Sequence, residues 1–166
     1  MPEPNHPSHV KTALLAGVTG AILIDLYLWV TEALLMHRTT ALTIFQWDAS
    51  NFLGPSAFQA GVGVALFGCL LHLIMSLIWG AIYTLATFRV RALAKNWLVS
   101  GAIFGVIVRL VMAHLIVPLG RATMPLAHGL YLVNLYVAHI LFFGIPVAWV
   151  ISRAPASASA AAPPAT

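Results

Sequence analysis

Two opposite charges interrupt long apolar stretches of the sequence, and charges in such places could handle protons or ions. Asp25 lies within TALLAGVTGAILIDLYLWVTEALLM, and Arg109 lies within LVSGAIFGVIVRLVMAHLIVPLG. Each stretch is long enough to cross a bilayer, so we expect each charge near the hydrocarbon centre. A lone charge there costs roughly 3 kcal/mol on insertion scales. We therefore predict that Asp25 and Arg109 face each other inside the protein.

Such a pair has two interpretations, which the sequence leaves open. It is either a structural ion pair that locks two helices together, or a site where a proton or ligand competes for the carboxylate. Snorkelling of Arg109 to the membrane surface is disfavoured, because Pro118 at the end of its stretch is about nine residues, or roughly 13 Å, away.

Further polar residues are expected at comparable depths. His72 and His139 lie about halfway along the second and fourth apolar stretches, so with Asp25 and Arg109 they define a predicted central polar cluster. A second layer nearer the outside is predicted to contain Glu32, His114 and Asn134.

The histidines raise the question of a cofactor. His72 and His139, from different helices, could supply two axial ligands to a b-type haem. However, each helix offers one histidine and no paired ligand motif, which favours hydrogen bonding between helices. Metal ligation by His72, His114 and His139 is disfavoured because the spacings typical of metal sites are missing. The cofactor therefore stays open: haem b, a pigment and a quinone are alternatives, with none preferred.

Composition defines the elements that must position these residues. Of the 166 residues 61% are hydrophobic and only 7% are charged, which indicates an integral membrane protein. Four spans are predicted near 12–36, 60–87, 97–118 and 129–151, each above the ~20 residues that a crossing helix needs. We expect an all-α four-helix bundle in residues 12–153. A short cytoplasmic segment (1–11) precedes it, and a disordered Ala/Pro/Ser-rich tail (154–166) follows.

The basic residues predict the topology. They lie at span ends rather than in one patch, so the net charge of +4 does not indicate a nucleic-acid partner. The positive-inside bias places both termini in the cytoplasm and the first connection outside. One side carries Lys11, Arg89, Arg91, Lys95 and Arg153, whereas the other carries only Arg38 and Arg121.

The outside connection HRTTALTIFQWDASNFLGPSAFQ mixes aromatic and polar residues. This pattern predicts a short amphipathic helix at the membrane interface. We expect Asp48 to cap a turn that ends at Gly54 and Pro55. The segment is either a lid over the outer mouth of the bundle or an anchored connector.

Small residues recur at helical spacing on the faces that carry the polar groups. Gly17, Ala21 and Asp25 are in line in the first span, as are Gly101, Gly105 and Arg109 in the third. Such faces let membrane helices approach closely, so the polar groups are expected to point into the bundle. The predicted packing glycines are Gly17, Gly61, Gly68, Gly80, Gly101 and Gly105.

No enzyme motif is found, since the sequence contains no phosphate loop, dinucleotide fingerprint or GxSxG. We therefore expect a non-enzymatic membrane component whose polar centre stabilises the bundle and handles protons or a solute. One alternative is an accessory subunit of a respiratory or photosynthetic complex, packed on partner helices, pigment or quinone. A second is a b-haem electron carrier. Besides lipid, the expected partners are other membrane subunits or a second copy.

Three segments carry a resemblance to a known group. FGCLLHLIMSLIWGAIY, GAIFGVIVRLVMAHLIVPLG and AHILFFGIPVAWVISR resemble small bacterial inner-membrane proteins of the YagU-like kind. The similarity covers about residues 60–153, although Arg109 inside the third span departs from it. The resemblance implies a four-helix protein of the bacterial inner membrane and brings no established activity. The shared positions are Gly68, His72, Tyr83, Gly101, Gly105, Pro118 and His139.

Overall fold

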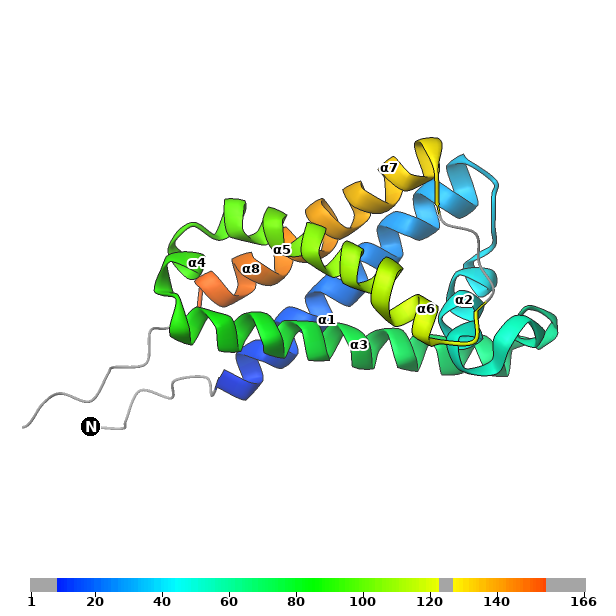
Figure 1. Ribbon diagram of the computed structural model, residues 1–166, viewed down its shortest axis with the longest axis horizontal. Coiled ribbons are helices and arrows are strands. Elements are labelled where there is room, and N and C mark those ends of the chain that lie inside the picture. Colours follow the sequence, from blue (N-terminus) through cyan, green and yellow to red (C-terminus); the bar gives the residue numbers. More distant parts are fainter. Residues whose placement is uncertain (1–8, 123–126, 155–166) are drawn as a thin grey trace, which may run out of the picture.

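The computed structural model describes residues 9–122 and 127–154, and within these ranges all regular structure is helical (Figure 1). Span one comprises α1 (His9–Leu28) and the π-helix η1 (Trp29–Leu35), and span two is α3 (Val62–Arg89). Span three comprises α5 (Trp97–Val111), η3 (Met112–Ile116) and α6 (Val117–Leu119). Span four comprises α7 (Gly129–Val137), η4 (Ala138–Gly144) and α8 (Ile145–Ser152). The connections contain α2 (Ala41–Leu53), η2 (Gly54–Gln59) and α4 (Arg91–Lys95).

Four of these helical stretches are long and apolar enough to cross a membrane. They run over His9–Leu35, Val62–Arg89, Trp97–Leu119 and Gly129–Ser152, which confirms the predicted all-α architecture with four helices that could span a membrane. The first begins three residues before its predicted start. Most of the predicted segment 1–11 and of the predicted tail 154–166 lies outside the described residues.

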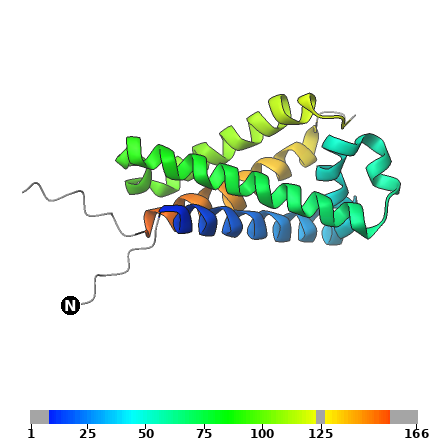
Figure 2. The ribbon, with the colours of Figure 1, turned by 90° about the horizontal axis from the view of Figure 1, so that it is seen from below.

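Span four occupies the centre of the packing. It lies against both α1 and α5, and α1 in turn runs beside α3 (Figures 1 and 2). The buried core along these contacts includes Ile24, Phe104, Phe143 and Val147. Large apolar side chains on the remaining faces point outward, as expected for helices that meet lipid.

Glycines allow the closest helix crossings. A Cβ added to Gly17 or Gly80 would meet backbone atoms of the partner helix at 2.8 Å, where α1 crosses α3. Gly101 and Gly105 approach the span-four backbone in the same way, and Gly68 approaches the Phe45 carbonyl of α2. These contacts agree with the predicted small-residue faces.

Gly61 is an exception to this prediction. A Cβ built there would meet no described atom within 4 Å, because Gly61 lies immediately before the first residue of α3 rather than inside a helix crossing. The predicted packing role of Gly61 is therefore wrong.

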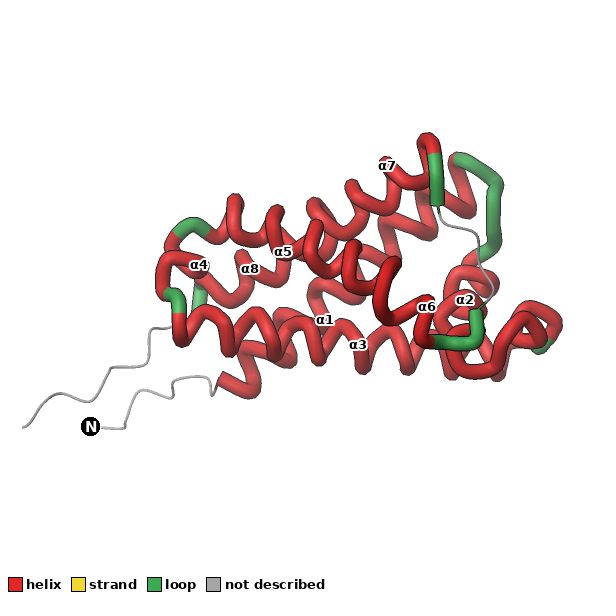
Figure 3. Tube along the Cα trace, in the orientation of Figure 1, coloured by secondary structure: helices red, strands yellow, loops and turns green. Residues whose placement is uncertain are grey.

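The outside connection folds into a helix that packs against the bundle. The side-chain oxygen of Thr40 accepts a hydrogen bond from the Thr43 backbone N–H, which caps the start of α2. The helix ends at Gly54, whose φ of 73° suits glycine. Asp48 lies within the helix, so the expectation that it caps a turn is wrong. Figure 3 shows α2 between the loop after span one and the start of α3.

Three spans contain a π-helical turn, and each turn carries an ionisable residue. Glu32 lies in η1, His114 in η3 and His139 in η4. Pro118 and Pro146 each follow a π-helical turn by two residues. Proline lacks the N–H that would continue the regular ladder, so a widened turn before it relieves the clash with the preceding carbonyl.

Candidate functional site

The imidazole of His72 lies between two carboxylates. Its Nε2 atom is 3.2 Å from Oδ1 of Asp25, and its Nδ1 atom is 3.6 Å from Oδ2 of Asp48. The first contact has ion-pair distance but not the angles of a hydrogen bond. The three residues come from α3, α1 and α2, respectively. We call them the carboxylate–histidine cluster.

Close backbone packing brings the three elements together. Gly68 precedes His72 by four residues, so the two lie on one face of α3. A side chain at Gly68 would collide with the Phe45 carbonyl, and Asp48 is three residues further along α2. On the other side, Gly17 and Gly80 bring α1 against α3. The glycines thus determine how near the two carboxylates come to the ring.

The cluster is partly shielded from its surroundings. Side-chain exposure is 20% for His72, 22% for Asp25 and 32% for Asp48. Asp48 lies outside the membrane-spanning helices, and there burial raises the pKa of its carboxyl to about 8, with a further contribution from the charge of Asp25. The raised pKa favours the protonated form of the Asp48 carboxyl near neutral pH.

The predicted pair between Asp25 and Arg109 is wrong. The structure contains no ion pair between these two described residues, and Asp25 contacts His72 instead. The Arg109 guanidinium carbon lies 5.9 Å from the centroid of the Tyr136 ring, and its Nε atom is buried without a hydrogen-bond partner. The reason is the order of the helices. Span four packs against both α1 and α5, whereas α1 and α5 are not principal partners of each other.

His139 forms its main contact within its own helix. Its Nδ1 atom lies 2.8 Å from the carbonyl oxygen of Leu135. The ring is also within electrostatic range of Arg109 and His72. The predicted central cluster is therefore divided. Asp25 and His72 meet, Arg109 faces Tyr136, and the His139 ring contacts the Leu135 carbonyl of its own helix.

A second polar network joins the end of span one to the beginning of span four. The Asn134 side chain donates to Oε1 of Glu32 and to Oγ1 of Thr31, and it accepts a hydrogen bond from the Tyr27 hydroxyl. Oε2 of Glu32 is 3.5 Å from Nε of Arg38. The predicted association of Glu32 with Asn134 is thus confirmed by a direct hydrogen bond.

His114 does not belong to this network. It lies in η3 on an exposed face, whereas Asn134 and Glu32 are buried between spans one and four. The prediction grouped His114 with these residues from its depth along the span alone. In the structure His114 lies on an exposed face of its helix.

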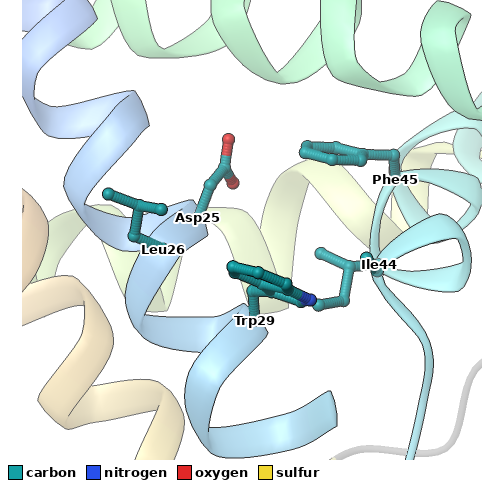
Figure 4. Close-up of a pocket in the computed structure, with 6 residues that line it drawn as sticks. Asp25, Leu26, Trp29, Ile44 and Phe45 are labelled. Atoms are coloured by element: carbon teal, nitrogen blue, oxygen red, sulfur yellow. The ribbon is translucent and has the colours of Figure 1, made fainter. Parts of the chain in front are cut away.

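A cavity of about 180 Å³ adjoins the carboxylate–histidine cluster. Figure 4 shows the Asp25 carboxyl and the Phe45 ring projecting toward the same space from α1 and α2, with Trp29 beside them. The lining is almost wholly apolar apart from the carboxyl. It consists of Asp25, Leu26, Trp29, Ala41, Ile44 and Phe45.

The cluster lacks the arrangement of a metal site. Within residues 9–122 and 127–154, no group of three or more His, Cys, Asp or Glu side chains has a geometry that could hold a metal ion. Both ring nitrogens of His72 face carboxylates, so ligation of a haem iron would require one of these contacts to break.

Comparison with known proteins finds no matching family model, no similar curated protein and no similar solved structure. The resemblance to YagU-like proteins stays a prediction.

Sequence reasoning assigned Asp48 a capping role and so missed its place in the site. One available signal was the position of Gly68 one turn before His72, which indicates that another backbone lies against this face. Tyr27 and Thr31 were also missed. They are four residues apart on the helix that carries Glu32, a spacing that predicts a shared polar face.

Proposed function

We propose that this protein is a small multi-pass membrane protein that handles protons at the carboxylate–histidine cluster. The observation that carries the proposal is the position of His72, whose two ring nitrogens face Asp25 from a span and Asp48 from the outside helix. Imidazole is the side chain best suited to gain and lose a proton near neutral pH. Ionisable residues within membrane spans are costly, and they mark proton relays and ion paths in many membrane proteins.

The proposed relay moves one proton from Asp48 to Asp25. The Asp48 carboxyl gives its proton to Nδ1 of His72, and the ring gives its Nε2 proton to the Asp25 carboxylate. Asp48 becomes a carboxylate, Asp25 becomes a carboxylic acid, and the ring changes tautomer. The 3.6 Å separation between Nδ1 and Asp48 must shorten for transfer, because hydrogen bonds to imidazole are shorter than this.

We also propose that the protein resides in a bacterial inner membrane with both termini in the cytoplasm. The charge bias supports this orientation, since Arg89, Arg91, Lys95 and Arg153 gather at one end of the bundle. The proposed topology puts α2 on the outer side, so Asp48 would receive protons from there.

Cysteine labelling tests the orientation. In a Cys69→Ser background, a membrane-impermeant maleimide should label Ser56→Cys, in the connection between spans one and two, on intact cells. It should label Asn96→Cys, between spans two and three, only after permeabilisation. Both positions are exposed in the structure. The opposite labelling pattern would reverse the proposed topology.

Proton uptake by reconstituted liposomes tests the relay. An internal pH-sensitive dye reports uptake after an acid jump on the outside. Asp25→Asn and His72→Gln should each slow uptake by about tenfold or more, the lower range for loss of a proton-transfer group. Glu32→Gln is the matched control, because Glu32 is a buried carboxyl of the separate network with Asn134. Equal rates in wild type, Asp25→Asn and His72→Gln would contradict the proposal.

A further inference from the structure

The cavity beside Asp25 has the size and the lining of a small-ligand site. Its volume of about 180 Å³ is comparable to that of engineered protein cavities that bind one benzene molecule. Leu26 and Trp29 are 50% and 43% exposed, so the cavity opens on the surface of span one. A ligand with an apolar body could enter there from the lipid.

The chemistry of the lining indicates a positive charge on the ligand. Of the six described residues that line the cavity, Asp25 alone is ionisable. The rings of Trp29 and Phe45 border the same space (Figure 4). Aromatic faces attract cations, and desolvation strengthens that attraction. An apolar cavity with one carboxyl and two aromatic rings therefore complements an organic cation.

We propose that this cavity binds a small organic cation with a single-ring apolar body, whose charge pairs with Asp25. The proposal rests on the proposed function, because the same carboxyl would alternate between the cation and a proton. His72 is the internal competitor. Its Nε2 atom lies 3.2 Å from Asp25, so a bound cation must replace this contact or share it.

Competition predicts that cation binding releases a proton. When Asp25 is protonated, it offers the cation no negative charge, and entry of the cation favours the carboxylate. The titratable groups around Asp25 are Asp48 on α2 and Cys69 and His72 on α3, with His139 of span four further away. All four enter the protonation equilibrium. Affinity for a permanently charged ligand should therefore rise with pH and level off once Asp25 is ionised.

Binding of radiolabelled benzyltrimethylammonium to the full chain in nanodiscs tests the proposal. This ion is always charged, and neopentylbenzene is its neutral isostere. Wild type should bind the ion and release protons into weakly buffered medium. Neopentylbenzene should displace it about tenfold or more weakly than the unlabelled ion does. Asp25→Asn should weaken binding by about tenfold or more, the effect of losing one charge-assisted contact.

Two aromatic variants and one control locate the site. Trp29→Leu and Phe45→Leu should each weaken binding by about threefold to tenfold through loss of one cation–π contact. Trp149→Leu should leave binding unchanged, because Trp149 is a similarly exposed tryptophan on α8, far along the chain from the cavity. Circular dichroism of each variant shows whether it folds. The neutral isostere tests charge recognition in wild type even if Asp25→Asn fails to fold.

The outcomes separate this inference from the proposed function. Absence of binding in wild type, with Asp25-dependent proton uptake intact, overturns the cation site and leaves the relay standing. Equal binding of the ion and its isostere means that the cavity recognises apolar shape alone, which also overturns the inference. Binding that survives Asp25→Asn unchanged does the same. If proton uptake does not depend on Asp25 while the cation still binds, only the relay is contradicted.

Discussion

His72 of α3 and Asp25 of α1 meet 3.2 Å apart, about two helical turns from the crossing of these helices at Gly17 and Gly80, and Asp25 also lines a cavity that opens on span one. The contact joins two of the four long apolar helices, and both side chains are largely shielded, with exposures of 20% for His72 and 22% for Asp25. Asp48 approaches the other side of the same ring from a helix outside the spans. The ring thus faces one carboxyl from α1 and one from α2.

A double-mutant cycle distinguishes the observed pairing from the one expected from sequence. The coupling free energy between Asp25→Asn and Arg109→Gln should be below about 0.5 kcal/mol, because residues without direct contact act additively. Arg109→Gln and Tyr136→Leu should instead couple by about 0.5–1 kcal/mol through the cation–π contact. The measurement is the free energy of unfolding in mild detergent. A coupling free energy above this limit between Asp25→Asn and Arg109→Gln would support the ion pair expected from the sequence.

Gly68→Ala should separate α2 from α3 and weaken the site. A methyl group at Gly68 would collide with the Phe45 carbonyl, so α2 must move. Overpacking of this kind costs about 1–3 kcal/mol of folding free energy. Proton uptake should fall together with stability, because Asp48 moves away from His72. Spin labels on α2 and α3 should report an increased separation in the variant.

Gly63→Ala is the matched control for this change. Gly63 lies five residues before Gly68 on the same helix, and a Cβ there would meet no described atom within 4 Å. Its replacement should leave both the unfolding free energy and the uptake rate close to wild type. Equal effects of the two alanines would show that helix propensity, and not the crossing at Gly68, is responsible.

Asn134→Ala should destabilise the contact between spans one and four. The Asn134 side chain bonds to Tyr27, Thr31 and Glu32, and its loss leaves the buried Glu32 and the half-buried Tyr27 and Thr31 without their shared partner. Hydrogen bonds between membrane helices average about 0.6 kcal/mol, so we expect a loss of about 1–3 kcal/mol for the set. Thermal unfolding in detergent measures it. Leu130→Ala, at an 80% exposed position, should have little effect, and a similar loss there would argue against the network.

The four spans could be predicted because apolar length alone defines them. The partner of Asp25 could not be predicted in this way. Position along a span gives only the depth of a residue, whereas its contacts also depend on the rotation of the helix and on which helices are neighbours. Asp25 and Arg109 were paired because their depths are similar, yet span four packs against both α1 and α5, the helices that carry them. Asp48 was hidden for a different reason. Its loop position gave no sign that α2 would pack on Gly68 and bring a carboxyl beside His72.

The raised pKa of Asp48 predicts how stability depends on pH. Its folded-state pKa of about 8 exceeds its ordinary value of 3.8, so the folded protein binds the proton more tightly than the unfolded chain does. The contribution of Asp48 to the free energy of unfolding is therefore complete below the ordinary value. It falls as pH rises toward 8, and it is level above that. The difference in unfolding free energy between wild type and Asp48→Asn reports this contribution together with the interaction of Asp48 with Asp25 and His72. Wild type should lose stability relative to Asp48→Asn from mildly acidic pH to pH 8, whereas a difference that is flat or of opposite slope would show that Asp48 is ionised at neutral pH.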